Sequence, residues 1–171
     1  MDKIVALKEL DFSKLLERQE MLDDKFKAKM GIDKLDERLI NIAYLDEVGE
    51  FLHELKPMWC YWKKDKKPID KQRVLEELSD CFHFYLSFIL ASQSNSFCDS
   101  LAYLRYMHHK KLSYVNDCNI YVLLNAFEDI TDYIMVLEFT LEKLGYTLQE
   151  FLAVHHQVWL RNMEIRTGDE Y

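Results

Sequence analysis

Two pairs of acidic residues, Glu47 with Glu50 and Glu77 with Asp80, flank a basic loop in the middle of this chain of 171 residues. Residues three apart on an α-helix share a face, with their Cβ atoms about 5–6 Å apart. If the two segments pack as an antiparallel helical hairpin, the four carboxylates converge, and their mutual repulsion requires a cation. Carboxylate oxygens suit Mg²⁺, which takes further ligands from water and substrate phosphates. The spacing therefore predicts a site for Mg²⁺ and a phosphate.

Turn-forming residues are scarce, with only 4 Gly and 2 Pro. Long helices joined by short loops fit this scarcity better than a sandwich or barrel of many strands. We therefore expect one all-α domain over residues 1–171, a bundle of about five to six helices. Apolar spacing and capping residues predict a second helix that begins at Asp33 or Asp36 and ends at Pro57. The other expected helices cover residues 13–30, 70–91, 97–111, 119–144 and 147–166.

The basic loop stands out against a formal net charge of −8, which argues against general binding of nucleic acids. Between Lys56 and Arg73 lie seven basic and two acidic residues, so this stretch suits a small polyanion. Trp62 is followed directly by Lys63, and such a pair can stack on a base and neutralise phosphates. Alternatively, the lysines only solvate the loop and the aromatic side chains close the end of the hairpin.

Two features of the apolar pattern favour a functional site. Glu77 and Asp80 precede a nearly continuous apolar run over residues 81–90, and burying their charges there is costly without a cation. The same run offers more apolar surface than one hairpin can cover, which favours a dimer. Gln19 lies on or beside the apolar stripe of the first helix, where its amide is either exposed at the edge or buried and available to bind something.

We expect a cytoplasmic protein without membrane segments. The N-terminal residues are too charged for a signal peptide, and no apolar run approaches the ~18 residues that a membrane helix needs. The four cysteines are widely spaced and form no Cys-x-x-Cys pair, so reduced thiols are expected rather than a zinc site or a disulfide framework.

The ordered motifs resemble those of the dimeric all-α dUTPases, which are relatives of the MazG-like nucleotide pyrophosphohydrolases. Gln19-x-x-Leu22-Asp23 is similar to the first motif of that family, and Glu47-x-x-Glu50 to the second. Trp62-Lys63 resembles the loop signature, and Glu76-Glu77-x-x-Asp80 followed by His83 and Phe84 resembles the third motif. The resemblance covers the chain from Gln19 to Leu90.

The resemblance implies a homodimer with the fold of the all-α NTP pyrophosphohydrolases, which hydrolyses dUTP to dUMP and pyrophosphate with Mg²⁺. It implies that the four carboxylates hold the metal and that Glu47 or Glu50 orients the attacking water. It also implies that Gln19 reads the uracil edge, that Trp62 and Phe84 line the base and sugar pocket, and that Asp80 can meet the 3′-hydroxyl.

The C-terminal segment departs from the family pattern. Asn162 matches an asparagine that closes over the phosphates, but Ile165 occupies the expected arginine position and Arg166 lies one residue later. Arg161 and Arg166 are the residues that can substitute. Two alternatives to a dUTPase stay open: a pyrophosphohydrolase of the same fold that prefers another base, as in dCTP, and a non-catalytic helical dimerisation protein.

Overall fold

The computed structural model describes residues 11–92, 124 and 126–166, and only the backbone of residues 135, 136, 139, 165 and 166. The expected all-α class is confirmed, because the described residues form helices and no strand. The long helices are α1 (Phe12–Met30), α2 (Glu37–Glu54), α4 (Lys71–Ser92), α7 (Tyr133–Leu144) and α8 (Leu148–Arg161). The short elements are α3 (Lys56–Trp59), two 3₁₀ turns (Ala126–Glu128 and Ile130–Asp132) and a π-helical turn (Asn162–Arg166).

Two of the expected helices differ from this arrangement. The expected helix over residues 97–111 lies outside the described residues. The helix expected over residues 119–144 is broken in its described part, where two 3₁₀ turns precede α7. Asp129 ends the first turn and caps the second, since its Oδ1 accepts from the Thr131 backbone N–H at 2.9 Å. A hydrogen bond from a nearby backbone N–H to an aspartate side chain competes with the backbone hydrogen bonds of a continuous helix.

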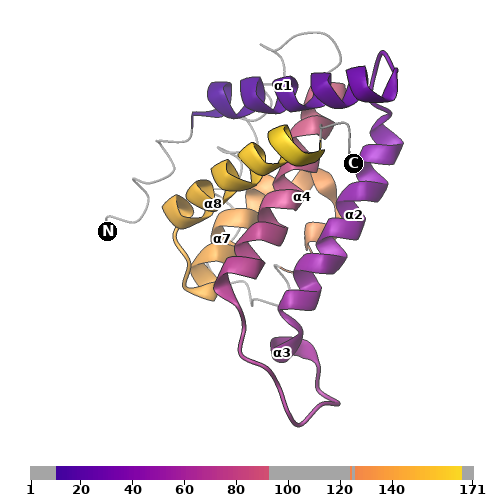
Figure 1. Cartoon of the computed structure of the whole chain (residues 1–171). Helices are drawn as coiled ribbons and strands as arrows, with labels where there is room; N and C mark the ends of the chain where they lie inside the picture. The colour runs from indigo at the N-terminus through magenta and orange to yellow at the C-terminus, as the bar shows by residue number, and fades with distance from the viewer. Residues whose placement is uncertain (1–10, 93–123, 125, 167–171) are drawn as a thin grey trace.

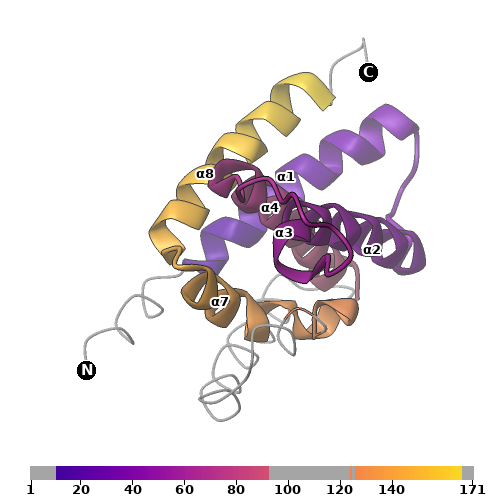
Figure 2. The ribbon, with the colours of Figure 1, turned by 90° about the horizontal axis from the view of Figure 1, so that it is seen from below.

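The hairpin of α2 and α4 forms the centre of the fold. The two helices run antiparallel, joined at one end by α3 and the basic loop, while α1 crosses the opposite end (Figure 1). Figure 2, which looks at the molecule from the loop end, shows α4 near the middle, with α2 and α8 on different sides of it. Because α4 packs against α1, α2 and α8, side chains from all three helices can meet those of α4.

Local signals explain where the helices begin and end. Gly31 ends α1 in the left-handed conformation (φ 64°), as its position in the sequence predicts. Asp36 caps α2 by accepting from the Arg38 backbone N–H. The helix that was expected over residues 13–30 begins at Phe12 and is capped by Asp11, which accepts from the Lys14 backbone N–H, rather than by Ser13. Asp and Ser are comparable caps, so composition alone does not separate them.

The apolar run of α4 is covered within the chain over most, but not all, of its residues. Cys81, Phe82, Tyr85, Leu86 and Ile89 are all buried. Covering aromatic rings include that of Tyr133, whose hydroxyl also donates to the Leu78 carbonyl at 2.6 Å. Phe84, Phe88 and Leu90 of the same run are only half-buried, so the expectation that this run favours a dimer stays a prediction. The large apolar side chains that are exposed near α2 lie elsewhere and are Ile32, Leu39, Ile42 and Leu45.

Among the described helices, none combines the length and apolar character needed to span a bilayer. Cys60 and Cys81 are buried free thiols. Cys98 and Cys118 lie outside the described residues.

Candidate active site

Three of the four predicted carboxylates meet where α2 faces α4. Glu47 on α2 and Glu77 and Asp80 on α4 each offer one carboxylate oxygen, and these oxygens lie within 4.8 Å of one another. Glu77 and Asp80 are buried and Glu47 is half-buried. Antiparallel packing explains the meeting, because it places the first pair opposite the second. The donor set consists of hard oxygen atoms and fits Mg²⁺.

Glu50, the fourth predicted carboxylate, is exposed and does not belong to this close group. Its charge still helps to raise the pKa of Glu77, so the two side chains are within electrostatic reach. Its role as a metal ligand or as the residue that orients water stays a prediction.

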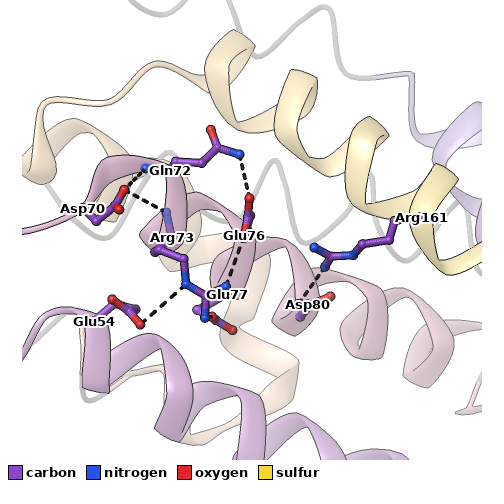
Figure 3. A network of polar contacts seen from close by, with 8 residues as sticks. All are labelled: Glu54, Asp70, Gln72, Arg73, Glu76, Glu77, Asp80 and Arg161. Atoms are coloured by element: carbon purple, nitrogen blue, oxygen red, sulfur yellow. Dashed lines mark hydrogen bonds and ion pairs between the residues drawn. The ribbon is translucent and has the colours of Figure 1, made fainter. Parts of the chain in front are cut away.

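Two arginines offset the charge of the carboxylates, as Figure 3 shows. Arg73, one turn before Glu77 on α4, pairs with Glu77 and also contacts Glu76 at 3.2 Å. Arg161, at the end of α8, lies 3.8 Å from Asp80. Burial raises the pKa of Glu77, Arg73 opposes that shift, and the neighbouring Asp80 adds to it. Glu77 is thus a carboxylate for which a further cation is favourable.

A cavity of about 420 Å³ extends from Asp80 to Gln19 on α1. Its volume lies within the range of about 300–1,000 Å³ that is usual for small-molecule sites. Phe84 and Asn162 contribute to the wall, together with apolar side chains of α1, α2 and the turn between them. The cavity therefore reaches the carboxylate group through Asp80 at one end and the first motif at the other.

Four buried polar side chains form a network at the α1 end of this cavity. Gln19 Nε2 donates to Asp23 Oδ1 at 2.8 Å and to Ser87 Oγ at 2.9 Å. Ser87 Oγ donates to the same Asp23 Oδ1 at 2.8 Å. Gln19 Oε1 lies 2.7 Å from His83 Nδ1, and because an amide oxygen only accepts, Nδ1 carries the hydrogen. All four residues are buried and line the cavity.

The network fixes the orientation of the Gln19 amide. A carboxylate oxygen only accepts, so Nε2 must face Asp23 and Oε1 must face His83. Both N–H groups of Gln19 are used inside the chain, which leaves this side chain no donor for a base. The role of Gln19 in reading the uracil edge, which the family resemblance implies, stays a prediction. The Gln19 amide holds Asp23, Ser87 and His83 in position by hydrogen bonds, and it also lines the cavity.

The carboxyl group of Asp23 has a raised pKa. Burial raises its pKa to about 6, although the hydrogen bonds from Ser87 and Gln19 act in the opposite direction. The spacing Gln19-x-x-x-Asp23 places both side chains on one helical face, and this signal could have marked Asp23 as a site residue. Ser87 and His83 are polar residues within an apolar run, which is a comparable signal.

The residues of α4 that face the site follow helical spacing. Glu77, Asp80, Phe84 and Ser87 lie three or four positions apart and therefore share one face. A helix rises about 1.5 Å per residue, so the ten steps from Glu77 to Ser87 correspond to about 15 Å along one rigid element. The distance between the carboxylates and the network around Gln19 is thus fixed by one rigid helix.

The remaining predicted residues are placed as follows. Asn162 is buried against the cavity, and its Oδ1 has no hydrogen-bond partner among the residues that the structure describes. The Arg166 side chain lies outside the described residues. Trp62 does not line this cavity, because the loop is at the other end of the hairpin, where Trp62 is 59% exposed against Tyr61 and Trp59. Lys63 lines a separate cavity of about 770 Å³ at that end.

Comparison with known proteins adds one finding. A family model described as dUTPase matches residues 11–168, which is nearly the whole chain and includes every element of the site. No curated protein matches the sequence.

Proposed function

Because the chain belongs to the all-α dUTPase family, we propose that it is a Mg²⁺-dependent nucleoside triphosphate diphosphatase that hydrolyses dUTP to dUMP and pyrophosphate. The observation that carries the proposal is the single cavity between the carboxylates and the buried network of Gln19 and Asp23. A nucleotide carries a polar base at one end and phosphates at the other. The cavity offers complementary groups at both ends.

Mg²⁺ fits the acidic end. Glu47, Glu77 and Asp80 would hold it, with Glu50 as the predicted fourth carboxylate. When bound, the ion neutralises phosphate charge and supplies an activated water. The fit rests on the donor set, because three carboxylates with close oxygens are favourable together only beside positive charge.

The chain's own residues supply position and orientation. Glu47 or Glu50 orients the attacking water. Phe84 presents an apolar wall to the base and sugar, and the network around Gln19 holds the polar edge of the base. Asn162 brings a buried, unpartnered acceptor to the same cavity, while Arg161 lies beside Asp80, where it can approach the phosphates. Arg166 stays a predicted phosphate contact.

The protein also acts as a homodimer in this proposal. Ile32, Leu39, Ile42 and Leu45 expose a group of apolar side chains on α2 and on the turn before it. Contiguous exposed apolar surface usually marks an interface. A second copy of the chain is the partner that the family suggests.

A panel of nucleoside triphosphates with Mg²⁺, scored for pyrophosphate release, tests the activity. We expect dUTP hydrolysis by the wild-type protein and a loss of about 100-fold or more in Glu77→Gln, because the amide weakens the metal site. Glu76→Gln is the matched control, since Glu76 also pairs with Arg73 but stands outside the carboxylate group.

Each alternative has its own result in this panel. Hydrolysis of dCTP without hydrolysis of dUTP would favour the pyrophosphohydrolase with another base preference. Absence of any Mg²⁺-dependent release would favour a non-catalytic dimer. Equal activity of Glu77→Gln and Glu76→Gln would remove Glu77 from the metal site.

A further inference from the structure

Arg73 contacts three carboxylates at once beside the acidic site. Its Nη2 donates to Glu77, its Nη1 lies 3.2 Å from Glu76, and its Nε lies 3.8 Å from Glu54 of α2 (Figure 3). Each nitrogen of the guanidinium group therefore faces a different carboxylate. Glu77 belongs to the close group of carboxylates, whereas Glu76 and Glu54 do not. Arg73 thus joins one carboxylate of the site to two that lie outside it.

Glu77 obtains its counter-charge from this arginine. The Glu77 side chain is 4% exposed, while that of Arg73 is 48% exposed. A buried carboxylate is costly to the fold unless a cation is paired with it. The neighbouring Asp80 adds to this cost, because its charge has the same sign. The guanidinium group reaches inward from the surface and neutralises the buried charge of Glu77.

Arg73 and a metal ion require the same carboxylate. A cation held by Glu47, Glu77 and Asp80 would lie close to the guanidinium group, and like charges repel at short distance. Arg73 can release Glu77 and still keep anionic partners, because Glu76 and Glu54 lie on its other two sides. Its half-exposed side chain has solvent around it in which to move. The energy of the contact between Arg73 and Glu77 is therefore subtracted from the binding energy of the ion.

We propose that Arg73 is a positioning residue that acts as the counter-ion of Glu77 in the metal-free protein and sets the affinity of the site for Mg²⁺ by competing for that carboxylate. The inference rests on the proposed function, because it takes Mg²⁺ as the ion that the carboxylates hold. The exchange involves no covalent bond. Arg73 gives up its hydrogen bond to Glu77 and keeps its contacts with Glu76 and Glu54.

Isothermal titration calorimetry of the metal-free protein with MgCl₂ measures this affinity without a nucleotide. We expect Arg73→Gln to bind Mg²⁺ at least about fivefold more tightly than the wild type, because a competing positive charge is removed. Arg73→Lys retains the charge and should stay within about twofold of the wild type. Arg38→Gln is the matched control: Arg38 is exposed and pairs with Asp36 outside the carboxylate group, so the affinity should change by less than about twofold.

Thermal unfolding gives a second measurement that a packing role alone would not change in the same way. Without Mg²⁺, Arg73→Gln should have a lower Tm than the wild type, because Glu77 loses its counter-ion. Saturating Mg²⁺ should then raise the Tm of Arg73→Gln by more than it raises that of the wild type. If Arg73→Gln is unfolded in metal-free buffer, circular dichroism during the addition of MgCl₂ replaces the titration. Refolding would support the inference, and absence of refolding would overturn it.

Failure of this inference is distinguishable from failure of the proposed function. Unchanged or weaker Mg²⁺ binding by Arg73→Gln would overturn the inference, and wild-type hydrolysis of dUTP would still support the proposed function. Weaker binding would show that Arg73 orients Glu77 for the ion, as hydrogen bonds to metal ligands usually do. Tighter binding by Arg73→Gln without hydrolysis of any nucleotide would support the inference and contradict the proposed function. Absence of Mg²⁺ binding by the wild type would overturn the inference, while the nucleotide panel still decides the proposed function.

Discussion

At the scale of single residues, Asp23 carries a cost that a purely structural side chain would not need. The residue is 6% exposed, and the pKa of its carboxyl group is raised to about 6, chiefly because burial disfavours the charged form. The ordinary value is 3.8. An asparagine could accept the same two hydrogen bonds at Oδ1 without a buried charge. The retained carboxylate therefore points to a use beyond packing.

The stability of Asp23→Asn should reveal this cost through its dependence on pH. With a folded pKa raised from 3.8 to about 6, the charge destabilises the fold by about 3 kcal/mol above pH 6. The penalty declines as pH falls from about 6 to about 4, because the folded state takes up a proton first, and it is absent below both values. Urea unfolding at pH 8.0, 6.0 and 4.5 should show the variant more stable at pH 8.0, with an advantage that shrinks as pH falls.

Asp24→Asn serves as the control for this series. Asp24 is exposed and pairs with Lys27, and an exposed ion pair contributes about 0–1 kcal/mol. A stability difference between wild type and Asp23→Asn that stays constant from pH 8.0 to 4.5 would contradict the raised pKa.

The sequence allowed part of the residue-scale site to be predicted. The acidic pairs and Gln19 could be identified because helical spacing places residues three or four apart on one face. The occupation of both Gln19 donors could not, because one acceptor, Ser87, lies 68 residues away on α4. Glu50 satisfies the same spacing rule as Glu47 yet is exposed, since the exact rotation of α2 against α4 is a tertiary property.

At the scale of elements, α8 is fixed firmly at its first turn. Thr147 Oγ1 accepts from the Glu150 backbone N–H, and the Glu150 side chain accepts from the Thr147 backbone N–H at 2.8 Å. Glu150 also pairs with Lys71 at the start of α4, at 2.6 Å. The beginning of α8 is therefore joined to the beginning of α4, and its far end delivers Arg161 and Asn162 to the site.

Removal of this cap should weaken the fold by a modest, measurable amount. We expect Thr147→Ala to lower the free energy of unfolding by about 1 kcal/mol, because the Glu150 backbone N–H loses its side-chain acceptor. Urea unfolding measures the change. Gln149→Ala is the control, since Gln149 is exposed in the same turn. Equal stabilities of the two variants would show that the capping box contributes nothing.

For the last helix, the sequence predicts the two ends well, whereas for α2 it does not predict which apolar side chains are buried. The last helix was expected to begin at Thr147 and extend to residue 166, and α8 with its π-helical turn covers that range. Capping residues act within a few positions and can be read locally. The apolar positions Leu39 and Ile42 also follow helical spacing, yet they are 65% and 63% exposed. Periodicity identifies an apolar position without saying which chain covers it.

At the scale of the whole molecule, the proposed homodimer can be tested by substitution of the exposed apolar side chains of α2. Ile42 and Leu45 lie three apart on one face and do not line the cavity of about 420 Å³. We expect a wild-type dimer in sedimentation velocity at micromolar concentration and a monomer for the double variant Ile42→Asp with Leu45→Asp. Two carboxylates on this face would be desolvated by association, which is unfavourable without partners.

The control is the same kind of substitution, an exposed leucine to aspartate, on a different helix. Leu160 is 41% exposed on α8, and Leu160→Asp should remain dimeric. A wild-type monomer under these conditions would contradict the proposed homodimer. Dissociation of Leu160→Asp with persistence of the double-variant dimer would move the interface to α8.

The continuity of α4 has a consequence for how this protein can diversify. Because one unbroken helix carries both ends of the site, inserting a single residue between Asp80 and His83 would turn everything beyond it by about 100° and take Ser87 off the shared face. Point substitutions in the network around Asp23 leave that helical register unchanged. Single substitutions can therefore change the polarity of the network, whereas a change in the distance between the carboxylates and the network requires a change in the length of α4.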